Sequence, residues 1–402
     1  MTMPGKVLEQ HTLVVRDGRI LDLLPSPAAA ARYAATVVVQ RPEHLLMPGM
    51  INAATHAAKS LFRGMGRGVD ALEQRFVGPE FVRDGTLAAI AEMLRGGITC
   101  FGDRYYFPDE AARTACDQGM RAVIGLPVAD TPSPWAQSAA EYLTRALAVR
   151  DEYKGHPLIS TAFAPHAPGL VSDATFGRVA TLADELDAGI VIDLHATQDD
   201  IDRSVAVHGA RPIERLWNLG LLTPALNAVY MTHAAAADIE LAQRTGIAIS
   251  LCPQSSIESE RQLPPAAAVA ASAIRLALAS GGGACRAQDL WREMNLLALL
   301  SGTAWDALSA ATRGGAAAVG MEADIGVLDT GKWADVCCVD FGTPGARPLG
   351  DPVTELVFCG GRDMVSDVWV AGRPLLADGE LIRLDWAAAA ARARAWTERF
   401  QS

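Results

Sequence analysis

The chain has 402 residues, half of them hydrophobic, which is enough for one large barrel with a smaller attached domain. Its formal net charge is −11 and it has no long basic run, which argues against nucleic acid and anionic membrane surfaces as partners. The first twenty residues lack the apolar core of a signal peptide, and the seven cysteines are scattered without a CxxC pair. We therefore expect a cytoplasmic protein with reduced thiols and no zinc ribbon.

The two ends of the chain carry matching strand patterns. Residues 12–15 and 17–20 predict a strand, a tight turn and a second strand. Residues 332–339 and 367–375 predict strands with turns between them near the other end. We expect both ends to build one small β-sandwich domain together, from residues 1–48 plus 330–402.

Between the two ends, apolar runs typical of buried strands alternate with helical stretches rich in Ala and Leu. This alternation predicts parallel strands joined by crossover helices, that is, an α/β fold with a (β/α)8 barrel over residues 49–329. In such a barrel the functional residues lie at the C-terminal ends of the strands. The runs that carry the pattern are strands at 122–126, 189–194, 228–232, 247–251 and 274–278, with a helix at 139–150.

Residues 47–58 read Met-Pro-Gly-Met-Ile-Asn-Ala-Ala-Thr-His-Ala-Ala. This segment resembles the first barrel strand of the triazine hydrolases and methylthioadenosine/S-adenosylhomocysteine deaminases, whose pattern is Pro-Gly-x-x-Asn-x-His-x-His. The resemblance implies an amidohydrolase barrel of the triazine hydrolase/chlorohydrolase branch and a homodimer. It extends over nearly the whole chain, through residues 81–86, 164–168, 252–253, 331–335 and 368–373.

In those families one divalent metal is held by two histidines of strand one, a histidine of strand five and an aspartate of strand eight. A glutamate of strand five and a histidine of strand six move the protons of the water that the metal activates. The resemblance leaves one metal ligand of four, so we expect no metal, no cofactor and no zinc-dependent deamination. The ligand positions fall on Ala54, His56, Asp193 and either Gly281 or Ser280, and the proton-handling positions on Ala196 and Tyr230.

The residues that remain suggest a different chemistry. Two ligands of one zinc ion lie roughly 3–3.4 Å apart, which is a hydrogen-bond distance once the metal is gone. His56 and Asp193 could then form a dyad in which the carboxylate orients the imidazole as a general base, with Tyr230 relaying a second proton. This predicts a repurposed, metal-independent enzyme that carries out hydrolysis, elimination, isomerisation or cyclisation on a small N-heterocyclic or nucleoside-like substrate.

Two alternatives stay open. The first is a catalytically inactive pseudoenzyme or binding subunit, in which the pair of His56 and Asp193 is structural. The second is a relocated metal centre, since His195 lies two residues from Asp193 on a strand and points to the same side. With His56 these residues would supply two histidines and one carboxylate.

Five residues are candidates for binding the substrate. His166 matches a family histidine that contacts substrate, and Arg104 is a cation at the barrel mouth that suggests a carboxylate or phosphate on the ligand. Lys59 is interpreted instead as part of a solvated face. The remaining candidates are His195, Gln254 and Ser280.

Overall fold

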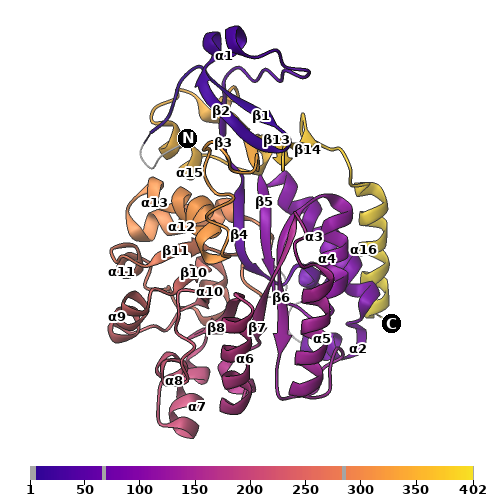
Figure 1. Cartoon of the computed structure of the whole chain (residues 1–402), viewed down its shortest axis with the longest axis vertical. Helices are drawn as coiled ribbons and strands as arrows, with labels where there is room; N and C mark the ends of the chain where they lie inside the picture. Colours follow the sequence, from indigo (N-terminus) through magenta and orange to yellow (C-terminus); the bar gives the residue numbers. More distant parts are fainter. Residues whose placement is uncertain (1–5, 66–68, 283–286, 402) are drawn as a thin grey trace.

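The computed structural model describes residues 6–65, 69–282 and 287–401 of the chain. In these ranges no helix is both long and apolar enough to cross a membrane. Figure 1 shows two parts: a barrel of strands surrounded by helices, and a smaller β-structure above it that contains segments from both ends of the chain.

The predicted (β/α)8 barrel is confirmed. Its strands are parallel and almost all of their residues are buried, as expected for strands covered on both faces. The two outermost strands meet through a parallel bridge between Thr55 and Gly281, which closes the barrel. In sheet order the strands are β4 (Met50–Thr55), β5 (Ile98–Asp103), β6 (Arg121–Val128), β7 (Ile159–Pro165), β8 (Gly189–Leu194), β9 (Leu226–Tyr230), β10 (Ala248–Leu251) and β11 (Arg275–Leu278).

Helices surround this barrel, and several begin at a side chain that caps their first turn. Ser138, Ser172 and Thr197 each accept a hydrogen bond from the backbone N–H three residues further on. The helices after β4 are α2 (Val69–Phe76), α3 (Pro79–Arg95), α4 (Pro108–Gln118), α5 (Ala139–Glu152), α6 (Asp173–Glu185), α7 (Gln198–His208), α8 (Pro212–Asn218), α9 (Ala236–Thr245), α10 (Pro253–Glu260), α11 (Ala266–Ala270), α12 (Leu290–Ser301), α13 (Ala304–Ser309), α14 (Gly315–Ala318), α15 (Pro352–Phe358) and α16 (Trp386–Gln401).

The small β-structure combines both ends of the chain, as predicted. A five-stranded antiparallel sheet and a two-stranded hairpin pack across a small core that includes Ile20, Leu328 and Val336. The sheet has the order β15 (Glu380–Leu381), β14 (Arg373–Ala377), β13 (Val365–Val370), β12 (Val336–Asp340) and β3 (His44–Pro48). The hairpin is β1 (His11–Arg16) and β2 (Arg19–Pro25), followed by α1 (Ser26–Arg32).

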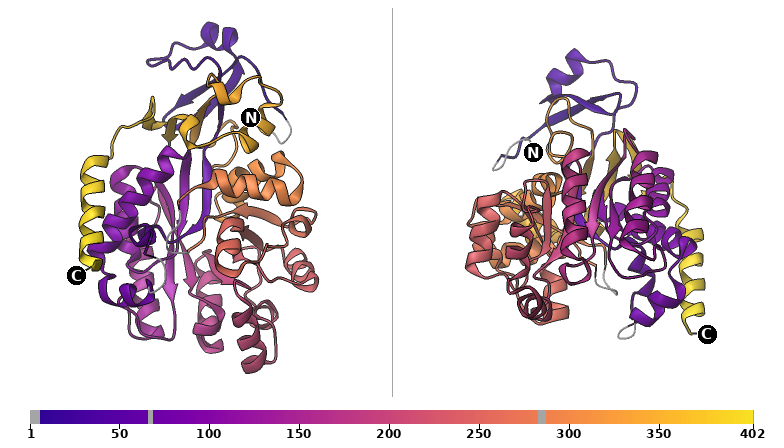
Figure 2. Two further views of the ribbon diagram at one scale, coloured as in Figure 1. Left: turned by 180° about the vertical axis from the view of Figure 1, so that it is seen from behind. Right: turned by 60° about the horizontal axis from the view of Figure 1, so that its bottom comes forward.

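The last helix, α16, leaves the small sheet and lies along the barrel. The indole N–H of Trp396 donates a hydrogen bond to Asp84 of α3 at 3.1 Å, and the ring meets Phe81 edge-on. Figure 2 shows α16 on the side of the barrel opposite α12 and α13. The division into residues 1–48 plus 330–402 and residues 49–329 stays a prediction.

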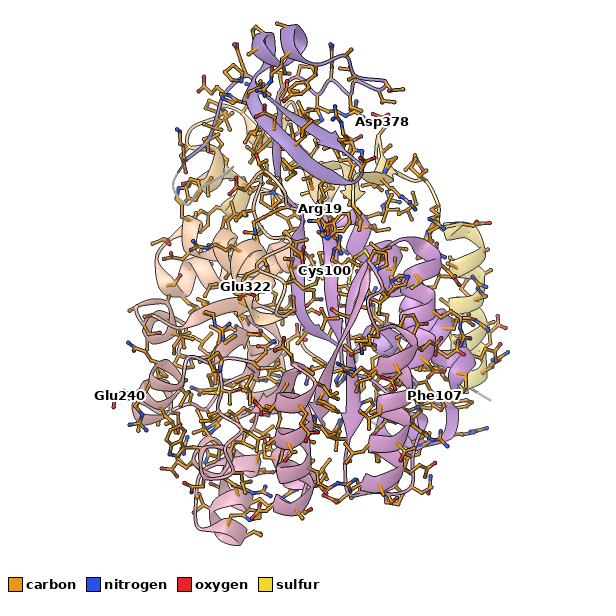
Figure 3. All side chains as sticks on the ribbon, viewed as in Figure 1. Arg19, Cys100, Phe107, Glu240, Glu322 and Asp378 are labelled. Atoms are coloured by element: carbon orange, nitrogen blue, oxygen red, sulfur yellow. The ribbon has the colours of Figure 1, made fainter. Side chains whose placement is uncertain are left out.

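A buried ion pair joins the barrel to the small sheet. Arg121 begins β6 and is fully buried, and its Nε and Nη2 donate to the two carboxylate oxygens of Asp335 at 2.6 and 3.0 Å. Asp335 also accepts the backbone N–H of Ala371. Trp333 lies between this guanidinium and that of Arg19, which Figure 3 labels near the hairpin. The small sheet therefore packs against the N-terminal ends of the barrel strands.

Replacing Arg121 should destabilise the fold strongly, because Arg121→Met leaves a buried carboxylate without its partner. We expect the free energy of unfolding in urea to fall by about 3–5 kcal/mol. Arg113→Met is the control, because Arg113 forms an exposed ion pair on α4 and its loss should cost less than about 1 kcal/mol. Equal losses for the two variants would contradict this role of Arg121.

Candidate active site

The candidate site lies where the C-terminal ends of the barrel strands meet, the end at which such barrels carry their active sites. His56 follows β4, Arg104 follows β5 and His166 follows β7, while Asp193 lies in β8 and Tyr230 ends β9. Five strands thus bring side chains from distant parts of the sequence to one place. It is the end remote from the small sheet.

Arg104 and Asp193 form the central ion pair of this site. Nη1 of Arg104 lies 2.5 Å from Oδ1 of Asp193, and Arg104 is only 6% exposed. Nε and Nη2 of the same guanidinium are buried and have no hydrogen-bond partner among the described residues. Burial lowers the pKa of Arg104, but the Asp193 carboxylate more than offsets this, so its pKa is raised and the guanidinium stays charged.

The prediction that His56 and Asp193 form a hydrogen bond is wrong. Asp193 binds Arg104 instead, and Nδ1 of His56 is buried with no partner in the part of the chain that the structure describes. The His56 ring packs so closely on Gly282 that a Cβ added there would lie 2.4 Å from Nδ1. Burial, reinforced by the positive charges of Lys59 and Arg104, holds the pKa of His56 well below its ordinary value. The imidazole is therefore neutral.

A small cavity opens beside this pair. It is lined by aromatic rings and apolar side chains, and Arg104 is its charged member. The ring of His166 is stacked against His56 on one side, with 6.5 Å between centroids, and against Tyr106 on the other, with 6.3 Å. The lining residues are Arg104, Tyr105, Tyr106, Pro127, Ala164, Pro165 and His166.

The sequence suggested that Lys59 belongs to a solvated face, but the structure shows that this interpretation is wrong. Its Nζ lies 2.8 Å from Glu73 of α2, and its side chain is only 17% exposed. The Tyr105 hydroxyl donates to the same carboxylate at 2.6 Å. Sequence reasoning did not include Glu73, Tyr105 and Tyr106 among the candidates. Nothing in the pattern indicated that Glu73 of α2 would reach Tyr105, which follows β5.

Tyr230 is held in a strained position at the end of β9. Its φ is +77°, a left-handed conformation that costs a residue other than glycine about 1–3 kcal/mol. Its hydroxyl accepts the backbone N–H of Gly282 at 2.7 Å. Burial and the nearby Asp193 raise the pKa of Tyr230, so the phenol is protonated at neutral pH. It thus lies beside the loop that carries the His56 contact.

The other predicted binding residues lie outside the cavity lining. The ring of His195 meets α8, where Nε2 accepts the N–H of Ile213 at 3.2 Å and Nδ1 lies 3.1 Å from Arg211. Ser280 belongs to a buried network with Asn52, Thr55 and Gln288 that ties β4 to the segment after β11.

Gln254 faces elsewhere. It lines a separate surface groove with α12 and residues after α15, and its side chain donates to Glu258. Only the neighbours of His195, Ser280 and Gln254 in space show that these residues do not line the cavity, and a single sequence does not contain this information.

A metal site in a protein draws its ligands mainly from His, Cys, Asp and Glu side chains. Within residues 6–65, 69–282 and 287–401 no three His, Cys, Asp or Glu side chains are grouped as a metal site. Asp193 is held by the Arg104 cation, and both ring nitrogens of His195 contact residues at the start of α8. The described residues therefore do not form the relocated centre of His56, Asp193 and His195 that the sequence left open as an alternative. Residues 283–286, which include Cys285, lie outside the described part. No step is assigned to a metal.

Comparison with known proteins places this geometry in context. The family model described as "Amidohydrolase family" matches residues 45–375. A protein of Teredinibacter turnerae named 5-methylthioadenosine/S-adenosylhomocysteine deaminase is 37% identical over 98% of this chain and 94% of its own length. The protein of that name from Saccharophagus degradans is 35% identical over 99% and 94%.

Solved structures agree in fold. An adenosine deaminase from Xanthomonas campestris with bound zinc has a TM-score of 0.97 and 40% identity, covering 99% of this chain and 95% of that one. Atrazine chlorohydrolase from Arthrobacter aurescens, complexed with zinc and atraton, has a TM-score of 0.88 at 20% identity, covering 97% and 95%. The second likeness concerns the fold alone.

These relatives overturn two expectations drawn from the sequence. A metal-independent enzyme repurposed for another reaction was expected, and a zinc-dependent deaminase was excluded. Full-length relatives at 35–40% identity are instead named deaminases, and one of them holds zinc. Both expectations are therefore wrong. They rested on a handful of positions, whereas the comparisons weigh the whole chain.

Asp103, which ends β5, should make stability depend on pH. Its Oδ1 accepts the backbone N–H of Ala57 at 2.7 Å, and burial raises its pKa from 3.8 to about 6. A carboxyl with a raised folded pKa stabilises the fold when protonated, and this contribution is lost as the pH rises through about 6.

We therefore expect the free energy of unfolding of the wild type to fall by about 3 kcal/mol relative to Asp103→Asn between about pH 3 and pH 7. Urea titrations of both proteins across this window measure the difference. The asparagine keeps an oxygen for the Ala57 N–H and does not titrate. A difference that is constant with pH would show that burial does not raise this pKa.

Proposed function

Because this chain belongs to the amidohydrolase family, we propose that its barrel takes up purine nucleosides of the kind for which its relatives are named, with hydrolytic deamination as the reaction class. The observation that carries the proposal is the 37% identity, over 98% of the chain, to a protein named 5-methylthioadenosine/S-adenosylhomocysteine deaminase. Because the match runs from end to end, it includes the strand ends that form the site.

The side chains around the cavity favour a flat heteroaromatic ligand, and because the cavity itself has a volume of only about 10 Å³, a nucleoside enters it by displacing lining side chains. The nearly parallel rings of His166 and Tyr106, which line the cavity, offer π-faces with which a purine can stack. Arg104 and His166 add polar groups to a lining of aromatic and apolar side chains, and a small-molecule site usually combines such residues.

His166 can both stack and form a hydrogen bond. Burial lowers its pKa, although the negative charge of Asp193 acts in the opposite direction. The neutral imidazole has one donor and one acceptor nitrogen, so it can bind either kind of atom on a purine edge or a ribose. It is the cavity residue that we expect to contribute most to binding besides Arg104.

The proposal predicts saturable binding of 5′-methylthioadenosine or its 6-oxo form, measured by isothermal titration calorimetry with one site per chain. His166→Ala should weaken this binding by about tenfold, because a hydrogen bond and a stacking partner are lost. His208→Ala is the matched control, since this histidine is exposed at the end of α7. If neither nucleoside binds the wild type, the proposed function is wrong.

Ammonia release from 5′-methylthioadenosine tests the reaction class. Protein treated with a chelator should release none, and protein supplied with zinc should release ammonia, as expected for a metal-dependent deaminase. The metal content of each sample is measured in parallel by elemental analysis. Release from the chelated protein would contradict metal dependence, and intact binding without release in either sample would limit the function to binding.

A further inference from the structure

Arg104 presents two buried donors that no described residue accepts from. Nη1 is used by Asp193, while Nε and Nη2 remain without a partner. These two nitrogens form one edge of the guanidinium, on which the N–H bonds run side by side and can bind two neighbouring acceptors. Because an unpaired buried donor destabilises a protein, an edge of this kind is expected to receive acceptors from a ligand.

The local charges decide which acceptors fit. Asp193 already neutralises Arg104, and Glu73 neutralises Lys59 at 2.8 Å. The free edge therefore needs acceptor atoms but no further negative charge. A neutral carbonyl oxygen beside a ring nitrogen meets this need better than a phosphate, whose charge would lack a cation of its own.

The position of Arg104 indicates which part of a nucleoside it meets. A deaminase attacks the purine carbon that carries the amino group, so this carbon must lie at the reacting centre. The positions that the family resemblance assigns to that centre are occupied here by His56, Asp193 and Tyr230. Arg104 contacts Asp193 and lines the cavity next to them, so its side chain lies close to the 6-position of a purine bound at that centre.

We propose that the Nε and Nη2 edge of Arg104 binds O6 and N7 of a 6-oxopurine nucleoside, and that the 6-oxo form is the tighter ligand. This inference rests on the proposed function, since it requires a purine nucleoside in the cavity. An amino group at the 6-position is a hydrogen-bond donor, so its N–H bonds would face the N–H bonds of the guanidinium without an acceptor between them. A carbonyl oxygen at this position accepts hydrogen bonds from the guanidinium. Arginine selects guanine over adenine in DNA through the same pair of acceptors.

The test compares 5′-methylthioinosine with 5′-methylthioadenosine by calorimetry on chelated protein, so that turnover does not disturb the titration. We expect the 6-oxo nucleoside to bind about 5–150-fold more tightly, the range for one bidentate contact. Arg104→Lys keeps the charge next to Asp193 and removes the edge, so the ratio of the two dissociation constants should fall to about one.

Further variants guard against an effect on folding. Arg104→Gln combined with Asp193→Asn removes both charges of the pair, leaves no unpaired carboxylate, and should also abolish the preference. Arg113→Gln changes an exposed arginine of α4 and should keep the wild-type ratio. The wild-type ratio tests the proposal even if a variant at Arg104 fails to fold.

The outcomes separate this inference from the proposed function. If both nucleosides bind but the 6-amino form binds equally well or more tightly, the role of Arg104 is wrong and the proposed function stands. If neither binds, both are wrong. Inorganic phosphate that competes with the nucleoside, and does so less well in Arg104→Lys, would show that the edge takes a free oxyanion and would overturn the inference.

Discussion

Closure of the barrel is the constraint on which the site depends. The segment after β11 returns to β4, where the Gly281 N–H donates to Ala54 at 3.1 Å and Gly281 forms a bridge with Thr55. The next residue, Gly282, has room for no side chain because His56 fills the space. Since Gly282 also donates to the Tyr230 hydroxyl, one short segment sets the relative positions of β4, β9 and β11.

The charges inside the site are arranged as neighbouring pairs. Arg104 is paired with Asp193, and Lys59 with Glu73, so two cations and two anions lie near the cavity without a large net charge. Ion pairs of this kind are costly to bury and contribute less to stability than to specificity. They keep the adjoining imidazoles neutral, because burial and the two cations together oppose a further positive charge on His56. The site is thus polar without being strongly charged.

The sequence predicted the fold far better than the details of the site. Long apolar runs marked β6 and β8, and the helix at 139–150 became α5, because burial and periodicity are properties of a local segment. The partner of Asp193 could not be predicted in this way. The family resemblance assigns Asp193 and His56 to positions of one metal site, yet the longer Arg104 side chain, 89 residues away in sequence, reaches the carboxylate instead. The choice between two candidate partners depends on side-chain reach, which no local pattern contains.

The pairing of β3 with β12 has a consequence for synthesis on the ribosome. Pro48, at the end of β3, and Cys337 of β12 are separated by 289 residues. At ordinary rates of translation, β3 therefore waits roughly 15–60 s before its partner strand emerges. During that time the edge of β3 is unpaired while the barrel strands appear one after another. An unpaired strand edge is prone to pair with other chains. The nascent protein is therefore most prone to aggregation, and to capture by chaperones, before β12 has been synthesised.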